Sequence, residues 1–323
     1  MTQLSPLQRA LLDWFAANGR DLPWRRTRDP YRILVSEIML QQTQVDRVMP
    51  KYAAFLELFP TAEALAAAPT ADVIKAWQGL GYNRRAVNLQ RAAQAVVAAG
   101  YPGDPAAFPD TPEGLRSLPG IGAYTAGAVA CFAFERDVAF LDTNIRRVVR
   151  RLLAGPEDQP PETSEAALVS LAAGLVPPGR GWAWNQAIME LGATICTAAR
   201  PQCWRCPLRE SCAAYRAWSE ADSNANLLEW TPPVAKVRRK AAEQPFHTSN
   251  RFFRGRVIDA LRGLADDGAH TLAELGPLVK EEWSDDELPW LARLAQGLAV
   301  DGLLVWRDQP GADLAAWSVA LPR

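Results

Sequence analysis

Apolar residues recur at helical spacing through most of residues 1–218, which predicts that this part of the chain is helical. Near the start, an amphipathic helix is predicted from the apolar residues Leu4, Leu7, Leu11, Leu12 and Phe15. Further helices are predicted at 31–41, 44–58, 62–67, 71–78, 84–98, 112–117, 123–134, 143–154, 164–175 and 182–195. Proline and glycine separate these segments, because neither residue continues a helix readily.

The pattern changes after residue 218. Residues 219–250 have the composition of a linker. Beyond them come three helical patterns, near 251–264, 270–279 and 287–300. Two strand-like runs, LLVW and AAWSV, then follow on either side of RDQPGAD. Three helices and a hairpin predict a small α+β, winged-helix-like domain at 251–323.

Composition is that of an ordinary soluble protein, with 49% hydrophobic and 22% charged residues. There is neither a signal-peptide pattern nor an apolar run long enough to span a bilayer, so we expect a cytoplasmic protein that does not contact membranes. The net charge of −1 is unevenly spread. Residues 219–323 carry 12 basic and 16 acidic side chains, a net charge of −4 that is unpromising for DNA binding.

Arginines are concentrated in the first 218 residues, where basic side chains outnumber acidic ones by 23 to 20. They form three clusters, namely Arg25, Arg26 and Arg28; Arg84 and Arg85; and Arg146, Arg147, Arg150 and Arg151. Such clusters suit contact with phosphates. Solvated helix faces give the same pattern and remain the alternative.

Four of the five cysteines lie within 17 residues, as Cys196-x6-Cys203-x2-Cys206-x5-Cys212. A disulfide framework is not expected in the cytoplasm, so the spacing indicates a metal. Zinc ribbons usually pair two C-x2-C units, and only one is present here. Four thiolates in one compact loop favour a [4Fe–4S] cluster, with zinc or free thiols as alternatives. Cys131 lies in an apolar helix and is expected to pack in the core.

The segment LPGIGAYTAGAV (residues 118–129) predicts a tight glycine turn between two helices. Glycines let the backbone approach a ligand closely, and the exposed N–H groups of the second helix face that ligand with the positive end of the helix dipole. The turn therefore suits a phosphate without needing a basic side chain. A purely structural turn is the alternative.

Two carboxylates have contrasting sequence surroundings. Glu37, in SEIMLQQTQV, shares a predicted apolar helix face with Ile33, Leu34 and Leu40, so we expect a desolvated acid with a raised pKa. Asp142 precedes a helix and is expected to cap it, which favours an ionised carboxylate. A proton donor facing a fixed negative charge suits cleavage of a glycosidic bond. A solvated helix glutamate and a simple cap are the alternatives.

Taken together, these motifs resemble the endonuclease III superfamily of helix-hairpin-helix DNA glycosylases. LPGIGAYTAGAV, Asp142 and the cysteine spacing match the superfamily. SEIMLQQTQV, GLGYNRRAVNL and WNQAIMELGATIC are similar to the MutY-type adenine DNA glycosylases. The resemblance covers about residues 5–215. It implies a six-helix barrel (21–134), a cluster domain (1–20 and 135–218) and a [4Fe–4S] cofactor on Cys196, Cys203, Cys206 and Cys212.

The resemblance also implies an activity. Such enzymes excise adenine mispaired with 8-oxoguanine or guanine after flipping it out of double-stranded DNA. Glu37 would protonate adenine N7 and later activate water, and Asp142 would stabilise the cationic sugar. Tyr124 and Asn144 match positions beside the reaction centre. Because a lysine replaces Tyr124 in strand-cleaving relatives, we expect a monofunctional enzyme with little or no lyase activity. We also expect a monomer.

The remaining site positions are also carried over by the resemblance. Gln42 and Tyr82 match residues that wedge into the opened duplex. The hairpin backbone at Gly120, Gly122 and Ala123 would hold a DNA phosphate. The expected lining of the adenine pocket consists of Arg20, Trp24, Arg25, Leu40, Val45 and Gln186.

Two departures and two rival functions remain. The β-rich, Nudix-related domain that reads 8-oxoguanine in many relatives is not evident, and FHTS at 246–249 is a poor substitute for its recognition loop. LDTN at 141–144 has threonine where LDGN is common, which puts the local backbone shape in doubt. The rivals are a thymine or uracil mismatch glycosylase on the same scaffold, and a non-catalytic iron–sulfur DNA-binding protein.

Overall fold

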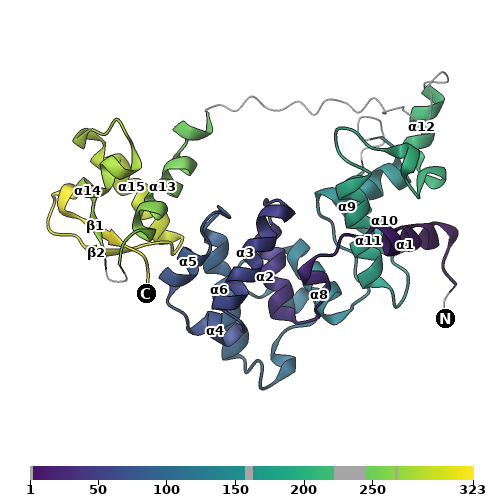
Figure 1. Ribbon diagram of the computed structural model, residues 1–323, viewed down its shortest axis with the longest axis horizontal. Coiled ribbons are helices and arrows are strands. Elements are labelled where there is room, and N and C mark those ends of the chain that lie inside the picture. Colours follow the sequence, from purple (N-terminus) through teal and green to yellow (C-terminus); the bar gives the residue numbers. More distant parts are fainter. Residues whose placement is uncertain (1–2, 157–162, 222–244, 266–267) are drawn as a thin grey trace. The chain divides into compact units, whose positions relative to one another are not determined.

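The computed structural model describes residues 3–156, 163–221, 245–265 and 268–323, so most of the predicted linker at 219–250 lies outside the described residues. Helices make up most of the described chain, and the strands gather near its C-terminus (Figure 1). The predicted fold class, mainly helical with a small C-terminal sheet, is therefore confirmed. The described residues fall into two compact units.

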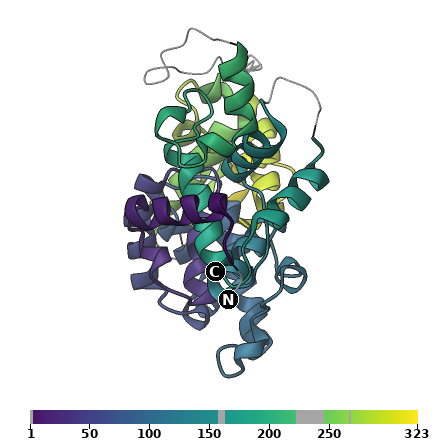
Figure 2. The same cartoon turned by 90° about the vertical axis from the view of Figure 1, so that its right-hand side faces the viewer.

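The first unit contains the described residues of Met1–Ile33, Pro109–Ser117 and Ile121–Arg238. At its centre α11 contacts α1, α8 and α9 (Figures 1 and 2). A Cβ added to Gly192 on α11 would lie 2.8 Å from Cβ of Asn144, so glycine is what lets the start of α9 approach this closely. The helices of this unit are α1 (Pro6–Asn18), α7 (Pro112–Arg116), α8 (Ala123–Phe134), α9 (Thr143–Val149), α10 (Glu165–Leu175), α11 (Gly181–Thr194) and α12 (Ala213–Ala221).

The helix predicted at 143–154 changes character halfway. After α9 the chain continues as a π-helical turn over Arg150–Ala154. Arg151 in this turn is 2% exposed, and its guanidinium donates to the carbonyl of Thr197 at 2.8 Å. The wider turn thus directs a charged side chain inward, which the regular apolar pattern of the sequence did not indicate.

The second unit contains the described residues of Leu34–Phe108, Leu118–Gly120 and Arg239–Arg323. Within it α6 packs against α4 and α5. The buried amide of Gln90 on α6 donates to the carbonyls of Leu65 and Ala68 at the end of α4. The helices before the linker are α2 (Pro30–Leu40, of which residues 34–40 belong here), α3 (Val45–Leu58), α4 (Ala62–Ala67), α5 (Thr70–Ala76) and α6 (Arg84–Ala98).

The described part of residues 245–323, called here the C-terminal segment, belongs to the second unit and contains three helices and three strands. The antiparallel sheet has the order β1-β3-β2, and His270 of β1 lies opposite Val319 of β3. The two-residue β1 was not predicted, because it is too short to show alternation. The elements are α13 (Asn250–Arg262), β1 (His270–Thr271), α14 (Leu272–Val279), α15 (Leu288–Val300), β2 (Val305–Asp308) and β3 (Ser318–Ala320).

One hydrophobic core joins the C-terminal segment to α5 and α6. Val257 and Ile258 of α13 are fully buried in the same cluster as Ile74 of α5 and Val87 of α6. Arg262 of α13 also donates to the carbonyl of Ile74 at 2.9 Å. These contacts hold α13 beside α5 within the second unit (Figure 1).

Over the described residues, none of the helices combines the length and apolar character needed to cross a bilayer.

Candidate functional site

Glu37 lies in the second half of α2, and only 2% of its surface is exposed. The sequence predicted one apolar face around it. That prediction underestimated the burial, because every residue from Ile33 to Met39 is buried. Burial of this kind removes the hydration that favours the charged form of a carboxyl group. The helix therefore buries an acidic residue in a mostly apolar segment.

The two predicted wedge residues have an unusual backbone. Gln42 follows α2 and Tyr82 precedes α6, with φ angles of 56° and 47°. Non-glycine residues adopt this left-handed conformation rarely, and such strain gathers at functional sites. Both residues are exposed, and the exposed fraction of Tyr82 is 41%. Each lies in a short turn that presents its side chain outward.

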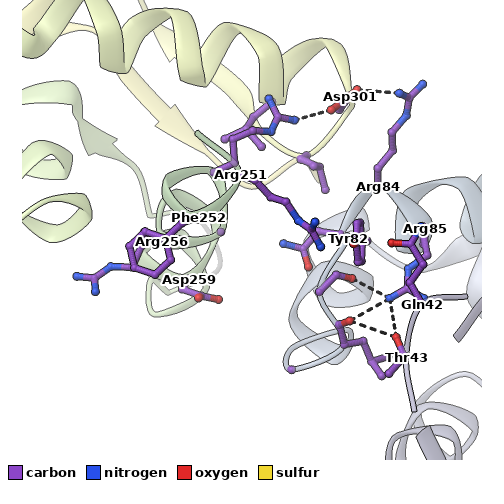
Figure 3. A pocket seen from close by; sticks show the side chains of 18 of the residues that line it. Gln42, Thr43, Tyr82, Arg84, Arg85, Arg251, Phe252, Arg256, Asp259 and Asp301 are labelled. Carbon is purple, nitrogen blue, oxygen red and sulfur yellow. Dashed lines mark hydrogen bonds and ion pairs between the residues drawn. The ribbon is translucent and has the colours of Figure 1, made fainter. Parts of the chain in front are cut away.

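Arg85 fixes both of these turns. Its guanidinium donates to the carbonyls of Ile38 (2.8 Å) and Met39 (3.0 Å) at the end of α2, and to that of Leu80 (2.9 Å) before α6. Burial lowers the pKa of Arg85 to about 10, which leaves it charged at neutral pH. A cation suits this position, because the negative end of a helix dipole lies there. Figure 3 shows Arg85 beside Gln42 and Thr43.

Leu40 and Val45 are half-buried on either side of the turn that carries Gln42. The structure thus brings together, within the second unit, four of the predicted positions: Leu40, Gln42, Val45 and Tyr82.

In the first unit, two predicted pocket residues, Arg20 and Arg25, converge on a glutamate that the sequence reasoning missed, and a third, Gln186, contacts Arg25. Glu190 on α11 accepts from Nε of Arg20 at 2.6 Å and from Nη2 of Arg25 at 2.7 Å. Arg25 also donates to the side-chain oxygen of Gln186 at 2.7 Å. Trp24, which precedes Arg25 in the chain, is buried. Glu190 follows Gln186 by four residues, and that helical spacing was the available signal.

Glu190 is 1% exposed and remains charged because of its partners. Burial raises its pKa, but the hydrogen bonds from Arg20 and Arg25 outweigh burial and hold the pKa of Glu190 below its usual range. One buried carboxylate therefore orients two guanidinium groups at fixed positions.

Asp142 caps α9, as predicted. Its Oδ1 accepts from the backbone N–H of Ile145 at 2.6 Å, and its Oδ2 accepts from the amide of Asn144 at 3.2 Å. Arg147 donates to Oδ1 of Asn144 at 2.8 Å and so orients that amide. Burial raises the pKa of Asp142 above its ordinary value, against the lowering effect of the hydrogen bonds. The cap was expected to favour the ionised carboxylate, but its lowering effect on the pKa is smaller than the raising effect of burial.

Thr143, the residue that departs from the LDGN pattern, is the first residue of α9. Asp142 keeps the extended backbone of an ordinary cap, with φ −93° and ψ −176°. Threonine is thus accommodated without disturbing the cap. Tyr124 lies in the first turn of α8, where its ring meets that of Phe140 edge-on at 5.6 Å.

The glycine turn of residues 118–122 has two distinct requirements. Gly120 has a φ of 76°, and a Cβ there would lie 2.6 Å from Cβ of Asn88. Gly122 caps α8 without a side-chain hydrogen bond, and no atom lies within 4 Å of the position its Cβ would take. Gly122 and Ala123 are both exposed. The fold therefore requires glycine at Gly120, whereas Gly122 leaves open space in front of α8.

All four cysteines of the loop line one cavity of about 20 Å³, together with Arg151 and Arg209. Burial, reinforced by neighbouring thiols, raises the pKa of both Cys203 and Cys206 to about 12. Nη1 of Arg151 lies 3.6 Å from Sγ of Cys196. Cys131 is fully buried elsewhere, as predicted.

Four thiols line this cavity, and thiolates are ligands that suit zinc or an iron–sulfur cluster. In the described part of the chain, no group of three or more His, Cys, Asp or Glu side chains is placed to hold a metal ion. Four sulfurs facing one cavity nevertheless match the donors of an iron–sulfur cluster, which needs four thiolates. The buried cation of Arg151 would offset part of their negative charge.

Most of the clustered arginines have partners within the chain. Arg26 pairs with Asp21, Arg28 with Glu135 and Arg146 with Glu165. The predicted phosphate contacts from these clusters stay a prediction, and Arg151 is reassigned to the cysteine loop because it is buried there.

Comparison with known proteins gives consistent results. The family described as "HhH-GPD superfamily base excision DNA repair protein" matches residues 35–173. An adenine DNA glycosylase of Mycolicibacterium smegmatis is 43% identical over 260 residues, 80% of each chain. One of Mycobacterium tuberculosis is 39% identical over 287 residues, 88% of this chain and 84% of that protein.

Among solved structures, a thermostable thymine-DNA glycosylase is 32% identical, with a TM-score of 0.58. The match covers 65% of this chain and 95% of that one. The sequence similarity to the two mycobacterial enzymes extends over four-fifths or more of the chain, and about two-thirds of the chain shares the fold of the solved glycosylase. The chain therefore belongs to the adenine DNA glycosylases of the helix-hairpin-helix base-excision-repair superfamily.

Proposed function

We propose that this adenine DNA glycosylase acts on adenine mispaired with 8-oxoguanine or guanine in double-stranded DNA, and hydrolyses the N-glycosidic bond after flipping the base. The observation that carries the proposal is the buried carboxyl group of Glu37 in the second half of α2. A glutamate surrounded by apolar residues is suited to hold a proton near neutral pH and to deliver it.

Proton delivery from Glu37 to adenine N7 makes adenine a better leaving group. The sugar then develops positive charge, which the carboxylate of Asp142 stabilises. Burial raises the pKa of Asp142, and the hydrogen bonds that it accepts from Ile145 and Asn144 oppose this rise by favouring the ionised form. After the base departs, Glu37 is a carboxylate and removes a proton from the attacking water.

We further propose pocket and wedge roles for the remaining site residues. The salt-bridged set of Arg20, Arg25 and Glu190, with Gln186, supplies oriented donors and acceptors for a polar base edge. Trp24, Leu40 and Val45 supply apolar walls. The exposed side chains of Gln42 and Tyr82 enter the space left by the flipped base. The backbone at Gly120, Gly122 and Ala123 holds a phosphate at the start of α8.

Base excision without strand cleavage is supported by the lack of a lysine at the candidate site residues. Tyr124 occupies the hairpin position where strand-cleaving relatives have a lysine. Before residue 219 the sequence has only Lys51 and Lys75, on α3 and α5. We further propose that the enzyme works as a monomer in the cytoplasm.

The cysteine loop holds a [4Fe–4S] cluster through Cys196, Cys203, Cys206 and Cys212. The cluster, when bound, supplies four metal–thiolate bonds that fix the loop, and it takes no part in the excision chemistry proposed here.

Metal analysis tests this assignment. Protein purified without oxygen is expected to contain about four iron and about four acid-labile sulfide per chain, as a cube with four thiolate ligands requires. Changing Cys203 to serine is expected to lower both contents, whereas changing the buried Cys131 to serine leaves them unchanged. One zinc per chain with no sulfide would refute the cluster.

Four duplexes test the proposed specificity. They hold adenine opposite 8-oxoguanine, adenine opposite guanine, thymine opposite guanine and uracil opposite guanine. Strand breaks after alkali are expected only for the two adenine substrates, and no breaks are expected when alkali is omitted. Cleavage confined to thymine or uracil would favour a thymine or uracil mismatch glycosylase, in line with the structural similarity to the thymine-DNA glycosylase. Breaks without alkali would contradict the monofunctional mechanism.

A further inference from the structure

A cleft of about 960 Å³ lies within the second unit, where α13 meets the turns that carry Gln42 and Tyr82. Its walls come from residues 42–47, the turn at 79–85, α13 and the end of α15. Figure 3 shows the side chains of α13 on one side and those of the two turns on the other. None of the proposed roles accounts for the α13 wall.

The cleft is strongly basic. Seven arginines and two aspartates line it, without lysine or glutamate. This differs from the net charge of −4 that residues 219–323 carry overall. The sequence interpretation that the tail is unpromising for DNA overlooked how its charge is segregated. The acidic run of residues 281–287 lies outside the cleft lining, whereas four arginines of α13 face it, namely Arg251, Arg254, Arg256 and Arg262.

Several of these arginines are already neutralised. Arg84 and Arg254 share the carboxylate of Asp301. Arg262 is paired with Asp259 at 2.6 Å. The charges of Arg47 and Arg251, by contrast, meet no carboxylate among the described residues, and both side chains are exposed. The cleft therefore keeps a surplus of exposed positive charge beside the wedge residues.

Arg251 also contacts the wedge directly. Its guanidinium carbon lies 4.0 Å from the centre of the Tyr82 ring, close enough for stacking. A guanidinium stacked by its face keeps its edge N–H groups available for a phosphate. The core shared by Val257, Ile258 and Ile74 fixes α13 beside α5. Arg251 is thus held at a set position over Tyr82.

We propose that this cleft binds the phosphodiester backbone of duplex DNA, and that Arg251 both contacts a phosphate and positions Tyr82 for insertion. The second part rests on the proposed wedge role of Tyr82. The C-terminal segment accordingly adds a DNA contact through α13. Exposed cationic groups next to an aromatic ring are the arrangement that suits an opened nucleic acid strand.

Binding to an undamaged duplex tests the phosphate contact independently of excision. Fluorescence anisotropy gives Kd over a range of salt concentrations. Arg251→Ala is expected to reduce the slope of log affinity against log salt by about 1, and Arg47→Ala plus Arg251→Ala by about 2. Arg293→Ala is the matched control, because Arg293 is exposed on α15 and lies outside the cleft. Equal slopes for Arg251→Ala and wild type would overturn the contact.

Arg251→Lys separates charge from positioning. It is expected to keep the wild-type salt slope, because the charge remains, but to excise adenine more slowly at saturating enzyme, because an ammonium does not stack as a planar guanidinium does. Unchanged excision by both Arg251→Lys and Arg251→Ala would overturn the positioning role. If wild-type enzyme excised no adenine at all, the proposed function would fail while the salt slopes still decided the contact.

Discussion

Glu37→Gln is expected to slow adenine excision by about 10²–10⁴-fold, the range that a positioned general acid contributes. Glutamine has nearly the same shape as glutamate but cannot deliver a proton, so the buried site should remain filled. Single-turnover excision from a duplex with adenine opposite 8-oxoguanine measures the effect. The rate should be measured at saturating enzyme, so that weaker binding does not imitate slower chemistry.

The matched control is Glu57→Gln, the same substitution at an exposed position on α3 of the same unit. Its excision rate should equal that of the wild type. Duplex affinity should change little in either variant, because neither substitution removes a phosphate contact. A Glu37→Gln enzyme with wild-type single-turnover rate would exclude this carboxyl group as the acid.

Glu190→Gln is expected to reduce the free energy of unfolding by about 3 kcal/mol, the lower end of the range for breaking a buried ion pair. The carboxylate is 1% exposed and holds both Arg20 and Arg25, of which the latter side chain is 9% exposed. Removing the negative charge leaves the Arg25 guanidinium buried without a counter-charge. Urea unfolding at pH 7 measures the change.

The same pair predicts a dependence on pH. The folded-state pKa of Glu190 lies below its usual value of 4.5, because its hydrogen bonds with the two arginines outweigh its burial. Its stabilising contribution is therefore complete above about pH 4.5 and is lost as pH falls through the lowered pKa. The stability difference between wild type and Glu190→Gln should shrink over that acidic range and stay constant above it.

Glu165→Gln provides the comparison for both measurements. Glu165 pairs with Arg146 at the surface of the first unit, where both side chains are about half exposed, at 53% and 46%. An exposed ion pair contributes about 0–1 kcal/mol, so this variant should unfold within that range of the wild type. A loss at Glu190 no larger than the loss at Glu165 would show that the buried pair is not a stabilising feature.

Much of this enzyme was predictable because its signals are local. Helical periodicity depends on residues three and four positions apart, so nearly all helices of the first 218 residues were predicted close to their observed bounds. The cysteine spacing and the glycine turn are also short motifs. The family and the adenine-removing activity, inferred from such motifs, are confirmed by the relatives. The roles of individual site residues stay predictions.

What the sequence by itself determined, then, is the helical fold, the cysteine loop and the enzyme class, since each is carried by residues near one another in the chain. Tertiary structure alone decided the pairing of Arg25 with Glu190, which are 165 residues apart, and the stacking of Arg251 on Tyr82. It also decided that an acidic tail presents a basic face. The physical reason is that periodicity records which side of an element is apolar, whereas charge partners depend on which elements meet in space.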